Sequence, residues 1–383
     1  MIDLASVIRP GDHLLWGQAC AEPQTLVEAL VAQAGSLPTL DVFQGVSYTG
    51  ILKPAHASHL RISSYCGIGS NRALADAGAL EILRVPYSQL GPLIRNKKIG
   101  SDVVMVQVSP PNTRGEYSLG LAADYLVPAL ETARAVIGEV NAQVPWTHTE
   151  KTLRKGDFAL LVETSRPPAA PPASRRGDLE AAIARHAAPF IPEGATLEFG
   201  IGALPESICA ALAGRRGLKV HSGTIGDGVA DLIRSGAVSH ADCAMLIGSP
   251  RLFELARENS AIRLRSSEYT HGADTLSKIE RFVAINSAVE VDHQGQVNAE
   301  IARGSYVGAV GGAPDFVRAA NRSPGGVSLV LLPASRIVPA LSAPATLPAA
   351  DAGVIVSERG AADLRGCDPR ERERRLRAIS GNS

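Results

Sequence analysis

The chain has 383 residues, which is longer than a typical single domain and predicts two domains. Its 38 Lys and Arg balance its 38 Asp and Glu, so no basic excess points to nucleic acid or to an anionic membrane as a partner. Hydrophobic residues make up 45% of the chain and aromatic residues only 4%, which favours a globular enzyme over a protein that stacks single-stranded bases.

The sequence shows neither a targeting pattern nor a membrane span. Residues 1–16 lack a basic stretch followed by an apolar one, and no apolar run approaches the length of a bilayer. The cysteines have neither paired nor metal-ligand spacing; they are Cys20, Cys66, Cys209, Cys243 and Cys367. We therefore expect a cytoplasmic protein with free thiols, no bound metal and no membrane partner.

The first half of the chain alternates short apolar runs with segments of helical periodicity. We expect strands at 13–16, 41–45, 103–108 and 135–140, and helices at 25–33 and 71–77. Strands that alternate with helices predict an α/β unit with a mostly parallel sheet.

The clearest boundary in the chain is a proline-rich segment. Residues 165–177 read SRPPAAPPASRRG, which can join neither a helix nor a central strand and is typical of a stiff, exposed linker. We therefore expect an N-terminal α/β domain at 1–164, a linker at 165–178 and a C-terminal α/β domain at 179–383.

The stretch that organises the second half is 196–228. An apolar strand ending at Phe199 runs into Gly200-Ile201-Gly202, and a helix starts near Pro205. A strand, a glycine turn and a helix N-terminus make an anion-binding corner. A second such unit follows, with a strand at 218–220, a loop at 221–228 and a helix at 229–234. Two adjacent corners predict one ligand pocket at the carboxyl edge of a parallel sheet.

Several stretches together carry a family resemblance. They are QVSPPNTRGEYSLG (107–120), EVNAQVPWT (139–147), FGIGALP (199–205), INSAVEVDHQGQVNAE (285–300), VGGAPDF (310–316), SRIVP (335–339) and ERGAADLRG (358–366). In this order, they resemble the acetyl-CoA hydrolase/transferase family, the single-chain class I CoA-transferases of the 4-hydroxybutyrate CoA-transferase type. The resemblance implies two similar α/β domains of mostly parallel sheet, with the active site at their junction.

The resemblance also implies a chemistry. In this family a glutamate attacks the acyl-CoA, takes CoA as a glutamyl thioester and passes it to a second carboxylate. The expected partners are an acyl-CoA and an acceptor carboxylate, with the CoA thioester as substrate, no permanently bound cofactor, and a homodimer or higher homo-oligomer. Backbone N–H groups of glycine segments hold the oxyanion. The positions that the resemblance assigns to oxyanion or substrate binding are Gly200, Gly202, Gly223, Gly311, Gly312 and Asn286.

Three positions depart from the family pattern. Gly223 stands where the nucleophilic glutamate belongs, in a segment anchored by His221 and Asp227-Gly228. Glu198 replaces the usual glutamine, and His271 replaces an active-site asparagine. A glutamyl-CoA intermediate cannot form at a glycine.

These departures leave three hypotheses open. In the first, the enzyme transfers CoA with Glu198 as a relocated nucleophile. In the second, His271 is a general base, with Glu198 as its orienting partner, for hydrolysis, C–C cleavage or decarboxylation. In the third, the chain is an inactive acyl-CoA-binding protein. We expect His271 and Glu198 to be the catalytic residues.

Overall fold

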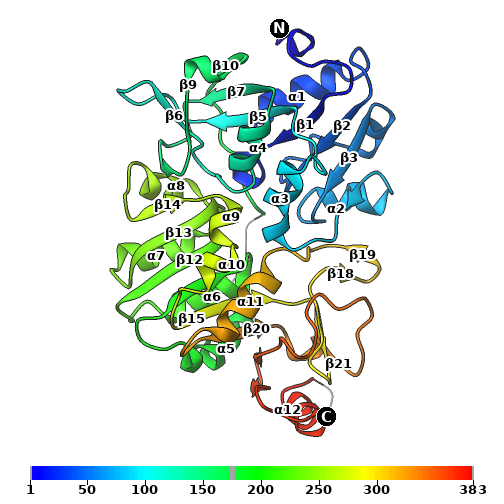
Figure 1. The fold of residues 1–383 in the computed structure, drawn as a ribbon. Helices are drawn as coiled ribbons and strands as arrows, with labels where there is room; N and C mark the ends of the chain where they lie inside the picture. The colour runs from blue at the N-terminus through cyan, green and yellow to red at the C-terminus, as the bar shows by residue number, and fades with distance from the viewer. Residues whose placement is uncertain (1, 173–176, 382–383) are drawn as a thin grey trace. The chain divides into compact units, whose positions relative to one another are not determined.

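The computed structural model describes residues 2–172 and 177–381, which form two compact units (Figure 1). Unit 1 comprises Met1–Pro172, Ala244–Glu268 and Ser305–Ala309, and unit 2 comprises Ala173–Cys243, Tyr269–Gly304 and Val310–Ser383. The first change of unit falls inside the proline-rich segment, of which residues 173–176 lie outside the described part. The expected division into two continuous domains differs from this arrangement, because the chain returns to unit 1 twice.

Unit 1 is built on a seven-stranded sheet in the order β10-β7-β5-β1-β2-β3-β4, and every pairing is parallel. The strands are β1 (His13–Trp16), β2 (Leu40–Phe43), β3 (Leu60–Ser64), β4 (Glu81–Ile82), β5 (Val103–Val108), β7 (Ala135–Asn141) and β10 (Leu160–Thr164). The apolar runs expected at 13–16 and 103–108 coincide with β1 and β5, because buried strands of parallel sheets are nearly continuous in apolar residues.

The helices and smaller strands of unit 1 complete its layers. They are α1 (Gln24–Gln33), α2 (Asn71–Asp76), α3 (Leu90–Arg95), α4 (Leu126–Thr132), α8 (Pro250–Ala256), the antiparallel pair β6 (Glu116–Ser118) and β9 (Thr152–Arg154), and the parallel pair β8 (His148–Thr149) and β14 (Ile262–Leu264). The core of the unit gathers side chains from β1, β2, β3, β5 and α1.

Unit 2 is built on a sheet in the order β23-β22-β20-β15-β11-β12-β13. The strands are β11 (Thr196–Phe199), β12 (Leu218–Ile225), β13 (Val238–Leu246, of which the residues to Cys243 belong to unit 2), β15 (Phe282–Ser287), β20 (Val327–Leu331), β22 (Val354–Ser357) and β23 (Gly360–Asp363). The pairings of β11 with β12 and β15, of β15 with β20 and of β20 with β22 are parallel, and β22–β23 is antiparallel. The prediction of two α/β units with mostly parallel sheets is confirmed.

The helices of unit 2 follow the expected alternation. They are α5 (Asp178–Ala187), α6 (Ala203–Ala211), α7 (Asp227–Arg234), α10 (Ala273–Leu276), α11 (Ala313–Arg322) and α12 (Pro369–Ala378). Helix α11 packs on β15 and β20, as Figure 1 shows. Small strands β16 (Glu290–Asp292), β17 (Val297–Asn298) and β21 (Ile337–Val338) form a separate sheet.

The strand order of unit 2 changes direction between β11 and β15. From β11 the chain builds the sheet outward through β12 and β13, and from β15 it builds the opposite side through β20 and β22. In open α/β sheets, a ligand binds in the crevice outside the carboxyl ends of the strands at such a reversal. The carboxyl ends of β11 and β15 are therefore where a site is expected.

Candidate active site

Strands β11 and β12 separate near their carboxyl ends, and the side chain of Ser222 bridges the gap. The backbone pairing stops at Leu197 opposite Val220. Beyond it, Ser222 Oγ accepts a hydrogen bond from Phe199 N and donates one to Phe199 O, both at 3.1 Å. The loop expected at 221–228 is wrong for its first half, because β12 also pairs with β13 on its other side and continues as a strand to Ile225.

Glu198 lies at the end of β11, where only 2% of the residue is exposed. Its Oε2 accepts hydrogen bonds from Asn286 Nδ2 at 2.8 Å and from Ile285 N at 3.1 Å, both on β15. Burial raises the pKa of Glu198 to about 8, against the opposing effect of these two hydrogen bonds. The carboxyl group is therefore mostly protonated at neutral pH, and the structure brings Glu198 and Asn286 together at the strand reversal.

Gly200 and Gly202, the two glycines of the turn after β11, have different structural roles. The N–H of Gly200 donates to Ile285 O at 2.9 Å and so continues the pairing of β11 with β15. Gly202 has φ +113°, a conformation that favours glycine, and a Cβ there would meet no atom within 4 Å. In this structure, the N–H group of Gly200 is engaged in the sheet, whereas Gly202 borders open space as the N-cap of α6.

The imidazole of His271 lies directly against Gly223. A Cβ at Gly223 would be 3.1 Å from Nε2 and 3.2 Å from Cε1 of His271. Gly223 lies in β12 and does not have a positive φ, so its backbone accommodates any residue. The imidazole of His271 thus occupies space that a side chain at position 223 would need.

His271 is held from three sides and is 4% exposed. Its Nδ1 is 2.8 Å from Thr270 Oγ1, and its ring centroid is 4.5 Å from that of Phe316 on α11. A Cβ at Gly312, the N-cap of α11, would be only 2.6 Å from His271 Nε2. The ring therefore fits between two positions without side chains, Gly223 and Gly312.

The same elements also place the predicted site position Gly311 and the neighbouring residue His221. Gly311 precedes α11 with φ +58°, a left-handed conformation that glycine adopts without cost. The Nε2 of His221 is 2.8 Å from Thr270 O, which ties β12 to the segment that carries His271. The structure thus places Gly223 and Gly312 against the imidazole ring of His271.

The hydrogen bonds of Glu198 are directed at β15. Its partners are Asn286 and Ile285, and His271 Nδ1 is paired with Thr270. The dyad expected between Glu198 and His271 therefore stays a prediction, with each group held by neighbours of its own.

Thr270 and Phe316 contact His271, yet the sequence pattern does not single them out. Phe316 is four residues after Gly312, so both face the same side of α11. That spacing was the available signal for Phe316. No comparable signal exists for Thr270, whose role depends on the neighbouring histidine.

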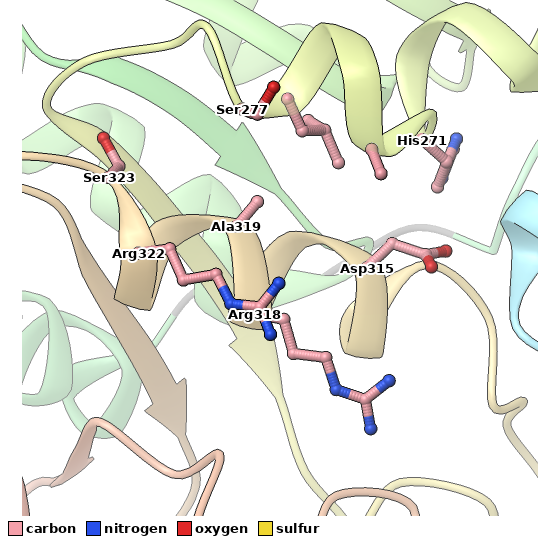
Figure 2. A pocket seen from close by; sticks show the side chains of 9 residues that line it. His271, Ser277, Asp315, Arg318, Ala319, Arg322 and Ser323 are labelled. Atoms are coloured by element: carbon pink, nitrogen blue, oxygen red, sulfur yellow. The ribbon is translucent and has the colours of Figure 1, made fainter.

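A cavity of about 230 Å³ extends from His271 between α10 and α11 (Figure 2). Its lining residues are His271, Ala273, Leu276, Ser277, Asp315, Arg318, Ala319, Arg322 and Ser323. The side chains beneath it form a small core of their own: Leu276, Phe282, Ala284, Phe316 and Ala320. Within the described ranges, no group of three or more His, Cys, Asp or Glu side chains is arranged to hold a metal.

Comparison with known proteins gives this arrangement its context. The acetyl-CoA hydrolase/transferase N-terminal domain matches residues 2–152, and the C-terminal domain of the same name matches residues 248–382. The 4-hydroxybutyrate coenzyme A transferase of Clostridium kluyveri is 31% identical over 97% of this chain and 91% of its own.

Solved structures show the same similarity in three dimensions. RipA from Yersinia pestis superposes with a TM-score of 0.94 at 29% identity, covering 98% of this chain and 92% of that one. The 4-hydroxybutyrate CoA-transferase of Porphyromonas gingivalis superposes with a TM-score of 0.83, also at 29% identity and with the same coverage. This chain therefore belongs to the acetyl-CoA hydrolase/transferase family and is an enzyme that processes acyl-CoA.

Proposed function

We propose that this enzyme acts on the thioester of a short or functionalised acyl-CoA without a glutamyl-CoA intermediate at position 223. The observation that carries the proposal is the contact between Gly223 and His271. Position 223 has no carboxylate, and the imidazole of His271 occupies the neighbouring space. The attacking group must therefore be water, an acceptor carboxylate, or a carboxylate elsewhere in the site.

The geometry supports His271 as the group that activates water. A tautomer with its proton on Nδ1 donates to Thr270 Oγ1 and has a lone pair on Nε2. Nε2 takes a proton as the water oxygen attacks the thioester carbonyl, and the C–S bond then breaks to release the free acid and the CoA thiolate. In transfer to an acceptor, its carboxylate attacks the thioester carbonyl and displaces the CoA thiolate to give a mixed anhydride, with no proton to remove. The thiolate then attacks the carbonyl derived from the acceptor, and the donor acid leaves as its carboxylate.

Glu198 contributes through Asn286 in this proposal. Its carboxyl group, buried and mostly neutral, holds the amide of Asn286 at the carboxyl end of β15. A fixed amide, together with the N–H groups near Gly202, Gly311 and Gly312, is suited to stabilise a tetrahedral oxyanion. Nucleophilic attack by Glu198 itself would require it to ionise first.

The test is an acyl-CoA panel followed by mass spectrometry. The protein is incubated with acetyl-, propionyl-, butyryl- and 4-hydroxybutyryl-CoA, each with and without acetate as acceptor. Free CoA and acid without acceptor indicate hydrolysis, and a new acyl-CoA that appears only with acceptor indicates transfer. Products of C–C cleavage or decarboxylation would redirect the proposal to another reaction. The absence of both turnover and binding across the panel would refute it.

We further propose a cytoplasmic homo-oligomer that binds neither nucleic acid nor membrane. The five cysteines form no disulfide bond in the described part of the chain, which agrees with a reducing compartment. In the described part of the chain, no helix is both long and apolar enough to cross a membrane. Oligomerisation rests on the family resemblance, and light scattering of the purified chain tests it.

A further inference from the structure

His221 is a buried imidazole that the proposed mechanism does not use. It lies on β12 two residues before Gly223, so the two positions face the same side of the strand. Only 5% of the residue is exposed. Its Nε2 is 2.8 Å from Thr270 O. Because a backbone carbonyl oxygen only accepts, this nitrogen of His221 carries a proton and donates the hydrogen bond.

Thr270 connects the two imidazoles of the site through polar contacts. Its backbone carbonyl accepts the hydrogen bond from His221, and its Oγ1 is 2.8 Å from His271 Nδ1. Thr270 is fully buried, so both contacts are shielded from bulk water. The donor on β12 therefore restricts the backbone from which the hydroxyl group of Thr270 projects toward His271.

Aromatic rings connect the same two imidazoles by a second route. The ring of His221 meets that of Phe282 edge-on, with centroids 6.4 Å apart and planes at 78°. The centroids of Phe282 and Phe316 are 6.1 Å apart, and those of Phe316 and His271 are 4.5 Å apart. Both phenylalanines are buried. Because buried side chains are close-packed, a displacement of His221 shifts the rings that lie against His271.

The imidazole of His271 needs this support because two of the positions that border it carry no side chain. The ring fits between Gly223 and Gly312, which offer it only backbone atoms. A general base must lie within hydrogen-bond distance of the proton that it takes, and a displacement of about 1 Å can lower a rate about 100-fold.

We propose that His221 is a positioning residue for His271. It holds the carbonyl group of Thr270 and supports Phe282, and in this way it keeps the hydroxyl group of Thr270 on Nδ1 and leaves Nε2 directed at the reacting water. The proposal rests on the proposed function, in which Nε2 of His271 takes the proton of that water. His221 acts through Thr270 and exchanges no proton with the substrate.

The experiment separates the hydrogen bond of His221 from its ring. His221→Phe keeps an aromatic ring against Tyr269 and Phe282 and removes the donor to Thr270 O. His221→Gln removes the ring and keeps a terminal N–H donor. With the acyl-CoA that the wild type turns over fastest, we expect kcat of His221→Phe to fall roughly tenfold to a hundredfold, with little change in KM. His221→Gln should retain most of the wild-type kcat.

His240→Phe is the matched control. His240 is a half-buried histidine on β13 of the same sheet, and its Nε2 is 2.9 Å from Asp242 Oδ2. Its replacement should leave kcat unchanged. Thr270→Val removes the hydroxyl group, and its effect on kcat should not add to that of His221→Phe, because both substitutions break the same link. Additive losses would overturn the proposal.

Side-chain 15N NMR of histidine-labelled protein provides a readout that a merely structural role would not move. The signals of His271 are assigned by their absence in His271→Ala. We expect one tautomer of His271 in the wild type and a mixture of both in His221→Phe. If His221→Phe lowers only the midpoint of urea unfolding, with kcat per folded protein and the tautomer as in wild type, the proposal is overturned.

A second pair of variants covers the case in which His221→Phe does not fold. His221→Asn has the same amide as His221→Gln on a side chain one methylene shorter, so it should not reach Thr270 O and should have the lower kcat. Equal kcat values in this pair overturn the proposal.

The proposed function fails separately if His271→Ala retains wild-type turnover, or if wild-type His271 carries its proton on Nε2. The NMR comparison then decides the positioning role without catalysis. One tautomer in wild type and a mixture in His221→Phe support it, and identical His271 signals in the two proteins refute it.

Discussion

At Glu198, a single carboxylate oxygen accepts both hydrogen bonds that the neighbouring strand provides. The donors are Asn286 Nδ2 and Ile285 N. A glutamine at this position can supply the same acceptor with its amide oxygen. The difference between the two residues is therefore the titration of the carboxyl group and not the pattern of hydrogen bonds that it accepts from β15.

This titration predicts how stability changes with pH. Burial raises the pKa of Glu198 from its ordinary value of 4.5 to about 8 in the fold, so the folded state holds the proton more tightly than the unfolded state. The stability that the protonated Glu198 carboxyl group adds to the folded state is fully present below about pH 4.5. It is lost as pH rises to about 8. Because glutamine does not titrate, the Glu198→Gln variant should not lose stability in this way. The difference in free energy of unfolding, variant minus wild type, should therefore increase from about pH 4.5 to about pH 8. Urea unfolding at several pH values measures it.

The control for this prediction is Glu193→Gln, since the side chain of Glu193 is 77% exposed. It should leave the pH dependence of the free energy of unfolding unchanged. A Glu198→Gln variant with the same pH dependence as wild type would contradict a buried, protonated carboxyl group.

His271 is the residue on which turnover should depend most. His271→Ala removes the imidazole beside Gly223, and we expect turnover to fall by roughly two to four orders of magnitude. The affinity for the acyl-CoA should change little, because proton transfer contributes to the transition state more than to binding. Steady-state kinetics and calorimetry of the same preparation measure both. His186→Ala, at an exposed position of α5, should retain wild-type kinetics. An unchanged rate in His271→Ala would make this residue structural.

Restoring a carboxylate at position 223 should require two substitutions. Gly223→Glu alone places a Cβ 3.1 Å from His271 Nε2, and such overpacking costs about 1–3 kcal/mol of stability. Gly223→Glu combined with His271→Asn removes the clash and creates the pair that the family resemblance predicts for these positions. We expect the double variant to recover stability and to form a glutamyl thioester that borohydride reduces. Peptide mapping locates the reduced residue. A double variant less stable than Gly223→Glu alone would show that His271 is not the obstacle.

At the scale of an element, β12 shows where sequence reasoning succeeds and where it stops. The apolar residues Leu218 and Val220 predict a strand there, and the strand exists. Its continuation through His221 to Ile225 reads as a loop, because glycine and polar residues dominate it. The extension depends on pairing with β13, and Ser222 Oγ bonds to the backbone of Phe199 on the other side; both contacts are tertiary, and no local pattern reports them.

Some features of the candidate site could likewise be predicted from the sequence, and others could not. The glycine turn and Glu198 at the end of β11 follow from strand and turn patterns, and the family resemblance predicts that positions 223 and 271 are unusual. That His271 fills the space beside Gly223 and Gly312 depends on the packing of α11 against β15. Spacing along the chain does not contain this information, because β12, the residues before α10 and the start of α11 are remote in sequence.

Helix α11 begins with a position that has no room for a side chain. Gly312 has φ −85° and ψ −9°, which alanine adopts, but its Cβ would be 2.6 Å from His271 Nε2. We expect Gly312→Ala to displace the imidazole, lower turnover at least tenfold and cost about 1–3 kcal/mol of stability. Gly214→Ala is the control, because a Cβ there meets no atom within 4 Å. Kinetics and urea unfolding check both; wild-type turnover in Gly312→Ala would contradict the tight fit.

At the scale of the whole molecule, unit 1 is completed by segments from the second half of the chain. Met245 forms a β-bridge with Ala122, and Ser267 N donates to Asp124 O at 3.0 Å. Ser266 N donates to Glu150 Oε2 at 2.7 Å. A fragment of residues 1–172 lacks all of these partners and should not unfold cooperatively, whereas the full chain should. Circular dichroism during urea unfolding tests this, and a sharp transition of the fragment would contradict it.

This return of the chain to unit 1 has a consequence during protein synthesis. Unit 1 begins to emerge from the ribosome first, yet it cannot close until residues 305–309 have been translated. At about 5–20 residues per second, the interval between residue 172 and residue 309 lasts roughly 7–27 s. For the first part of that time, until Met245 and Ser267 have been translated, the nascent sheet of unit 1 has no partner for Ala122 or Asp124. The incomplete sheet is therefore a natural substrate for chaperones, and the speed of translation through residues 173–309 becomes a determinant of the yield of folded enzyme.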